Sequence, residues 1–414
     1  MSVRPAPPAP PAPEPSSLSL TGEAALGRPI ALLSAAAFVS VATMRVADPL
    51  LPQVADEFQV SAGEASIVTT AFALAYGLCQ LVYGALGDRF GKYRLVTLMT
   101  LASALTTACA AFAGSLALLG LARLISGATA AAIVPLSMAF VGDHVPYQGR
   151  QAVLARFLTG TILGLVGGQV LGGTLGELVG WRAVFLLLGA LFLLVGALLA
   201  LEVRSSRVPA PLLTSSIRPA VILRGYRLLL GRAWARVILV TVFVEGFLFY
   251  GAFAFIGAFL HAHFDIGYAI VGVVLSAFGI GGLLYALTVR RLVDRIGERG
   301  LALGGSLVLA VGFIIVAQGP LATMAPAMIL LGLGMYMLHA TLQTHATQMA
   351  PEARGLAVST FANALFMGQA AGVWLSGLAV DRIGFPPVFV ACGLALTLLG
   401  AWFAMLLGRR APSS

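Results

Sequence analysis

The sequence predicts an all-α membrane protein with twelve transmembrane helices, arranged as two halves of six helices each. Two observations lead to this class. First, 59% of the 414 residues are hydrophobic and only 10% are charged, with a mean hydropathy of +0.97. Second, the apolar residues form unbroken stretches of about 20, the length of helix that crosses roughly 30 Å of hydrocarbon. Strands of a membrane barrel would show about ten residues of alternating polarity instead.

Twelve stretches meet this length, and each is predicted to be one helix that satisfies its own backbone polar groups. Their approximate limits are 30–51, 65–86, 95–113, 116–141, 152–175, 182–201, 237–260, 268–289, 301–317, 322–343, 355–378 and 387–408. The predicted halves are 29–201 and 237–408, joined by a cytoplasmic loop over 202–236. A disordered Pro-rich tail over 1–28 and a short tail over 409–414 are predicted to be cytoplasmic.

The positions of the basic residues predict the orientation of these helices. The net charge is +9, and all but four of the 25 Lys and Arg residues fall in or beside inner segments if the N-terminus is cytoplasmic. Cytoplasmic segments of membrane proteins carry this excess. The charge therefore sets topology rather than marking a nucleic-acid partner. It predicts an integral protein of a bacterial inner membrane, with both termini in the cytoplasm.

A short motif returns after the second, fifth, eighth and eleventh stretches. The copies are GALGDRFG (84–91), GTLGELVG (173–180), RRLVDRIG (290–297) and GLAVDRIG (377–384). Each copy has Gly at its eighth position and an acid at its fifth; the acids are Asp88, Glu177, Asp294 and Asp381. Because the motif recurs every third helix, the repeating unit is three helices.

Three is an odd number, so successive copies lie on opposite faces of the membrane. The first and third copies are predicted to be inside, and the second and fourth outside. Each half is therefore an inverted pair of three-helix units. Nested inverted units are typical of secondary transporters, whose site lies near the membrane midplane between the halves.

Ionisable side chains away from the helix ends occur in only four of the twelve stretches. They are Arg45, Asp48, Arg123, Glu245 and His339. They lie in the first, fourth, seventh and tenth stretches, which are the first helices of the four units and hence equivalent by symmetry. A charge inside a membrane is costly and faces a partner or a wet cavity. We therefore predict that these side chains line a shared central cavity.

Some of these residues also have a simpler interpretation. Arg45 and Asp48 are spaced i,i+3 and could merely pair with each other, and His339 could be a satisfied helix residue. Glu245 has no acid or base in the adjoining turns of its own helix. Burial favours the protonated form of a carboxyl group, which suits a residue that loads and releases protons.

The seventh stretch is also rich in aromatic residues around Glu245. Phe247 and Tyr250 are predicted to form an apolar wall of the cavity. Packing within the protein or contact with lipid is the alternative interpretation of such a stripe.

No metal, redox or enzymatic centre is predicted. Cys79, Cys109 and Cys392 lie in apolar stretches without the paired spacing that such sites require. The chain also lacks a nucleophile-and-base arrangement and a phosphate-binding loop. We expect no cofactor, and we expect a proton gradient to supply the energy for transport.

The first copy of the motif resembles a known signature. Gly84, Asp88, Arg89, Gly91, Lys92 and Arg94 are similar to the loop between helices 2 and 3 of the major facilitator superfamily. A second signature of that family, an Arg in helix 4 followed by a Gly four residues on, resembles Arg123 and Gly127. The resemblance covers the chain from about residue 30 to 408, and implies transport by alternating access.

The fifth stretch is similar to the glycine-rich helix 5 of the drug–proton antiporter branch of that family. The matching glycines are Gly164, Gly168, Gly172 and Gly173, and Gln169 stands where the branch has proline. Glycines allow helices to approach closely, whereas proline removes a backbone hydrogen bond and favours a bend. Gln169 keeps that bond and so departs from the antiporter pattern.

The resemblance implies that the first motif is a conformational latch. In the family, the acid matching Asp88 closes the cytoplasmic side by meeting the opposite half. Gly84 would allow the approach and Gly91 would make the turn. The basic residues that hold the loop inside are Arg89, Lys92 and Arg94. A weaker partner latch is expected from Asp294, Arg295 and Gly297.

Together these features predict a monomeric, lipid-embedded transporter that exchanges protons for small, partly apolar compounds. Glu245 and Asp48 would exchange protons, and Arg123 would either shift their pKa values or position the substrate. The alternative is a transporter or uniporter of a specific metabolite such as a sugar or an organic anion, for which Arg45 and Arg123 are suited. An ion channel is disfavoured, because inverted halves and latches imply alternation.

Overall fold

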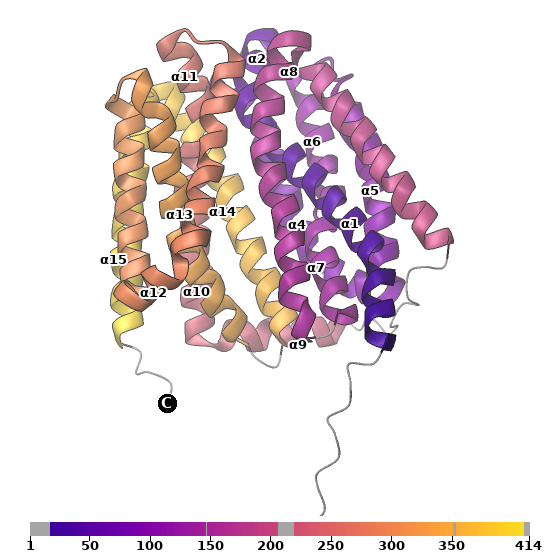
Figure 1. Cartoon of the computed structure of the whole chain (residues 1–414). Helices are drawn as coiled ribbons and strands as arrows, with labels where there is room; N and C mark the ends of the chain where they lie inside the picture. The colour runs from indigo at the N-terminus through magenta and orange to yellow at the C-terminus, as the bar shows by residue number, and fades with distance from the viewer. Residues whose placement is uncertain (1–16, 146, 206–218, 351–352, 410–414) are drawn as a thin grey trace, which may run out of the picture.

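The computed structural model describes residues 17–145, 147–205, 219–350 and 353–409, and its regular structure there is helical (Figure 1). In chain order the elements are α1 (Ser17–Arg45), α2 (Ala47–Phe58), α3 (Ala62–Ala65), α4 (Ile67–Phe90), α5 (Lys92–Ala110), α6 (Leu116–Ala130), α7 (Ile133–His144), α8 (Tyr147–Arg204), α9 (Pro219–Gly231), α10 (Ala233–Phe253), α11 (Ile256–Phe264), α12 (Tyr268–Gln318), the 3-10 turn η1 (Leu321–Thr323), α13 (Met324–Gln348), α14 (Arg354–Ile383) and α15 (Phe385–Arg409). α1 thus begins inside the segment predicted as a tail, of which residues 1–16 lie outside the described residues.

The described residues contain ten helical stretches that are long and apolar enough to cross a membrane. Two of them, Arg150–Arg204 and Tyr268–Gln318, have 55 and 51 residues, about twice what one crossing needs. Each is broken at a glycine with non-helical backbone angles, Gly180 in α8 and Gly297 in α12, where the chain turns back along the bundle (Figure 1). With both segments counted, the chain crosses twelve times, which confirms the predicted fold class.

The four copies of the sequence motif share one backbone feature. Their eighth residues, Gly91, Gly180, Gly297 and Gly384, are the glycines with positive φ in the described part of the chain, at +63° to +87°. Residues with a Cβ adopt this conformation at a cost, so glycine fits each turn. The same turn at four equivalent places agrees with three-helix repeating units.

Helices α1–α8 form one half of the molecule and α10–α15 form the other (Figure 1). In the first half α8 packs against α1 and α5, and in the second α12 packs against α13 and α15. The halves meet where α8 contacts α12 and where α4 contacts α14. We call the face that holds Asp88 and Asp294 the inner face, and the face that holds Glu177 and Asp381 the outer face, following the predicted orientation.

The first helix of three of the four units is interrupted along its length. α1 gives way to α2 at Val46, α6 to α7 at Ala131, and α10 to α11 at Ala254. Backbone groups next to such an interruption lack some of their helical partners. Polar side chains nearby can bond to them, and the candidate site is built around these interruptions.

Candidate functional site

The N-terminal half places a buried carboxylate just after the interruption of its first helix. Asp48 lies in the first turn of α2, where the helix dipole favours an acid, and is 2% exposed. Its Oδ2 accepts a hydrogen bond from Gln169 Nε2 at 3.1 Å and lies 3.9 Å from Arg45 Nη1. Arg45 and Asp48 therefore form the i,i+3 pair that their spacing allows, and Gln169 of α8 joins it.

Glycines of α8 bring Gln169 to this position. A Cβ at Gly164, Gly168 or Gly172 would collide with backbone of α1 or of its continuation at Val46. Gly173, on a neighbouring face, lies against α12 instead. The close approach lets a glutamine reach the carboxylate of α2. Proline, which has no side-chain donor, could not make this bond.

Arg123 of α6 is fully buried and bonds to backbone rather than to an acid. Its Nε donates to Val68 O at 3.2 Å and its Nη2 donates to Thr43 O at 3.1 Å. Thr43 lies in the last turn of α1, where carbonyls lack helical partners. The guanidinium also lies over the rings of Phe72 and Phe185, 4.3 and 5.4 Å from their centroids. Arg123 thus ties α6 to α1 and α4.

Arg45 also contacts the opposite half. Its guanidinium carbon lies 4.5 Å from the ring centroid of Tyr250 on α10, a distance typical of a cation–π contact. Phe247, the other aromatic residue predicted as a cavity wall, is half-buried. Gly368 and Gly372 of α14 lie against the backbone of Phe247. Tyr250 therefore links Arg45 to α10, the helix that also carries Glu245.

The C-terminal half holds a second buried carboxylate, paired with a histidine from another helix. Glu245 of α10 is fully buried, and its Oε2 lies 2.8 Å from Nδ1 of His339 on α13. Glu245 Oε1 has no hydrogen-bond partner in the described part of the chain. The His339 side chain is 19% exposed and lies 5.3 Å from the ring of Phe361. Because a carboxyl group and an imidazole meet at hydrogen-bond distance, one proton can lie on either side chain.

On the inner face, the first motif forms bonds within its own half. Asp88 lies 2.9 Å from Lys92 Nζ, which also lies 2.5 Å from Asp143 Oδ2 at the end of α7. Arg89 lies over the ring of Phe90. A Cβ added at Gly84 would meet nothing within 4 Å, so the opposite half does not cover this glycine here.

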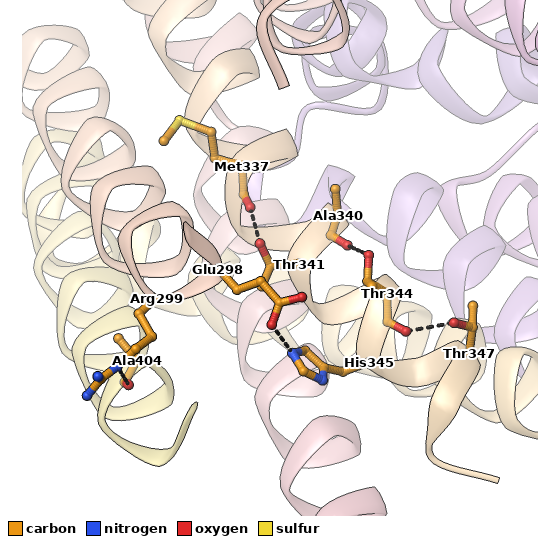
Figure 2. Close-up of polar contacts among 9 residues, drawn as sticks. All are labelled: Glu298, Arg299, Met337, Ala340, Thr341, Thr344, His345, Thr347 and Ala404. Carbon is orange, nitrogen blue, oxygen red and sulfur yellow. Dashed lines mark hydrogen bonds and ion pairs between the residues drawn. The ribbon is translucent and has the colours of Figure 1, made fainter. Parts of the chain in front are cut away.

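The residues just after the third motif are anchored inside the C-terminal half, as Figure 2 shows. Just after the Gly297 turn, Glu298 Oε2 lies 3.0 Å from His345 Nε2 on α13, and Arg299 Nε donates to Ala404 O on α15 at 3.3 Å. Asp294 and Arg295, before the turn, are exposed. These bonds fix the inner ends of three helices to one another.

The structure therefore assembles two charged groups, one in each half, and Tyr250 of α10 contacts Arg45 of the first group. Asp48, Arg45 and Gln169 form one, and Glu245 and His339 form the other. Sequence reasoning had assigned Gln169 to helix packing and left Asp143 out, although an acid at the inner end of a helix beside a basic loop was a usable signal. Among the described residues, no three His, Cys, Asp or Glu side chains gather in a way that could hold a metal ion.

Comparisons with known proteins agree with this architecture. A sequence model of the Major Facilitator Superfamily matches residues 33–268 and 243–414. The Uncharacterized MFS-type transporter YceJ of Bacillus subtilis is 27% identical over 342 residues, which cover 80% of this chain and 83% of YceJ. The Multi-drug resistance efflux pump PmrA of Streptococcus pneumoniae is 23% identical over 381 residues, covering 87% of this chain and 91% of PmrA.

Solved structures share the fold at lower sequence identity. The crystal structure of the nucleoside transporter NupG is 14% identical, and it superposes with a TM-score of 0.74 over 92% of this chain and all of NupG. A likeness at this identity supports the fold alone.

Proposed function

The chain belongs to the major facilitator superfamily, whose members are membrane transporters rather than enzymes, and we propose that it is a proton-coupled exporter. It would sit in the bacterial inner membrane as a monomer, with both termini in the cytoplasm. Its cargo would be small, partly apolar compounds. By alternating access, the halves would expose the central site to one face of the membrane at a time.

The observation that carries this proposal is the Glu245–His339 pair. A fully buried carboxylate with one oxygen unpartnered is held 2.8 Å from a histidine that is partly exposed. When Glu245 is protonated it can no longer form an ion pair with His339, so the contact between α10 and α13 weakens. Protonation thus changes which arrangement of the C-terminal half is stable, and this is what couples a proton to a conformational change.

Export of apolar compounds is supported by the surroundings of the pair and by a relative. Tyr250 and Phe361 place aromatic rings beside the two charged groups. PmrA, similar over most of its length, is a multidrug efflux pump. Asp48, which is bonded by Gln169, is a second candidate for proton exchange.

The proposal is tested with purified full-length protein in liposomes, with ethidium as a cationic aromatic probe. In proteins whose inner face points outward, an acidic lumen should drive ethidium into the vesicle. Glu245→Gln should fold and bind ethidium but lose the uptake that the pH gradient drives. Ethidium counterflow without a gradient should remain, because exchange of cargo needs no net proton movement.

Glu298→Gln is the matched control, since it breaks another Glu–His pair, which joins α12 to the inner end of α13. It should leave gradient-driven uptake near the wild-type rate. Normal coupling in Glu245→Gln would remove Glu245 from the proton pathway.

Transport of an organic anion is the second candidate, and the arginines of the N-terminal half favour it. Arg123 Nη1 has no hydrogen-bond partner in the described residues, and Arg45 is only loosely paired at 3.9 Å. Competition of ethidium uptake by neutral, cationic and carboxylate compounds separates the two candidates. Inhibition confined to carboxylates would favour the anion transporter.

A further inference from the structure

Two of the four motif acids, Glu177 and Asp381, lie on the outer face and have no part in the proposed site. They are the fifth residues of the second and fourth copies of the motif. In the structure, both carboxylates cross from their own half to the opposite one. Each carboxylate accepts a hydrogen bond from a backbone N–H group at the start of a helix in the opposite half.

Asp381, near the end of α14, reaches the start of a helix in the N-terminal half. Its Oδ2 accepts a hydrogen bond from Ser61 Oγ at 2.7 Å, and its Oδ1 accepts one from Gly63 N at 3.1 Å. Ser61 is the N-cap of α3, which leads into α4 as one stretch over Ala62–Phe90. The first N–H groups of a helix have no partner within it, and its dipole attracts an anion there.

Glu177 makes the mirror-image contact from the N-terminal half. It lies in α8, and its Oε2 accepts a hydrogen bond from Ala269 N at 2.8 Å. Ala269 is in the first turn of α12, whose N-cap is Gly267. By the repeat, α12 is equivalent to α4 and α8 is equivalent to α14. Asp381 therefore caps the stretch of α3 and α4, and Glu177 caps α12. These two target helices are equivalent members of opposite halves.

Glycines make room for both contacts. A Cβ at Gly63 would collide with the Asp381 carboxylate, and one at Gly267 would collide with that of Glu177. The first glycines of the two outer motif copies also lie against opposite-half backbone, Gly377 against Gly63 and Gly173 against Gly272. Gly84, the first glycine of the first copy, faces open space. The motif therefore contacts the opposite half on the outer face, but not at Gly84.

We infer that Glu177 and Asp381 are a matched pair of outer latches, which hold the outer face closed and release each time the site opens outward. The bonds are exposed, so water can replace each partner as the halves separate. A latch of this kind is reversible, and two of them on opposite halves resist opening symmetrically. Asp56 of α2 adds a third crossing contact, by accepting from Tyr268 Oη at 3.3 Å.

The inference rests on the alternating-access part of the proposed function and not on protons or cargo. It is tested by measuring the distance between spin labels on the outer face of full-length protein in lipid nanodiscs. Phe112 and Leu321 are exposed residues of opposite halves and can be replaced by labelled cysteines, after the three native cysteines are replaced by alanine. Wild type should show a closed and an open outer distance, with the closed one predominant.

The double variant Glu177→Ala/Asp381→Ala should raise the ratio of open to closed outer distances about tenfold. Glu177→Gln/Asp381→Asn, which keeps side-chain size and an acceptor oxygen, should raise it less and covers the case in which the alanine variant fails to fold. Glu64→Ala is the matched control. Glu64 caps the same helix as Asp381, by accepting from Ser61 N at 3.0 Å, but does so within its own half.

The outcomes separate the latch from the proposed function. If wild type alternates but both double variants keep its ratio, the latch is wrong and alternating access stands. An equal shift in Glu64→Ala would also contradict the latch, because weakening α3 alone would then explain the effect. A single outer distance in wild type, whatever the pH or added ethidium, would overturn alternation and the latch together.

Discussion

The two halves of the molecule each bury a carboxylate at equivalent helices, but they stabilise it in different ways. Asp48 is surrounded by Gln169, Arg45 and, further off, the charge of Arg123. Among the described residues, Glu245 is hydrogen-bonded by His339 alone. Arginine cannot lose its proton in a protein, so the N-terminal group carries permanent charge and must keep its bonds. The C-terminal pair can neutralise itself by moving one proton, which frees it to respond to pH.

The largest effect that this difference predicts is on the stability of the N-terminal half. Arg123→Met removes the bonds to Val68 O and Thr43 O and leaves Asp48 with less compensating charge. Each hydrogen bond from a charged group is worth about 1.5–3 kcal/mol, and this variant loses two of them. The free energy of unfolding in mixed micelles checks it. Arg123→Lys, which keeps the charge, should lose less, and an equally stable Met variant would contradict a structural role.

A smaller loss is expected when Asp48 keeps its arginines but loses the amide. Gln169→Leu removes a hydrogen bond to a charged group, worth about 1.5–3 kcal/mol. Gln369 of α14 is a second buried glutamine, 1% exposed, and Gln369→Leu is the matched control. Thermal unfolding of both variants should show the larger decrease for Gln169→Leu. Equal decreases would mean that any buried glutamine, bonded to an acid or not, has this effect.

In the C-terminal half the order of the effects should reverse, with little change in stability and a large change in transport. His339→Asn leaves Glu245 without its partner, but the carboxyl can become neutral by taking up a proton. Because the carboxyl can become neutral, the variant should lose less stability than Arg123→Met. Ethidium uptake driven by a pH gradient should nonetheless fall well below the rate of Glu298→Gln. If His339→Asn were unstable but its uptake still followed the pH gradient, His339 would have a structural role instead.

The sequence was sufficient to predict the architecture, because the repeat is marked by glycines and acids that few other residue types can replace. The four glycines with positive φ and the acids three positions before them lie at equivalent places in four units. The charged residues also stand out against apolar helices. These features allowed the twelve crossings, the halves and the candidate site residues to be predicted.

The pairings within the site could not be predicted, for a physical reason. Glu245 and His339 are 94 residues apart on two helices that are apolar all round, so no periodicity shows which face of each turns inward. The bond from Gln169 to Asp48 depends in the same way on how closely α8 approaches α1. The crossing contacts of Glu177 and Asp381 depend on how the two halves pack against each other at the outer face, which the sequence pattern does not specify.

The smallest predicted effect lies at the outer end of the N-terminal half, where a surface acid offers a pH-dependent contrast with the buried ones. The hydrogen bond from Arg182, and then that from Trp181 Nε1 at 2.6 Å, hold the pKa of Glu57 below its usual value. A lowered pKa means that the stabilisation is fully present above the usual glutamate range and is lost as the pH falls below it. Glu57→Gln should therefore have a lower unfolding temperature than wild type at pH 7, and the gap should close as the pH falls below the usual glutamate range. Because the side chain is 42% exposed, the gap at pH 7 should be smaller than that of any buried variant above, and a gap that widens in acid would contradict the assignment.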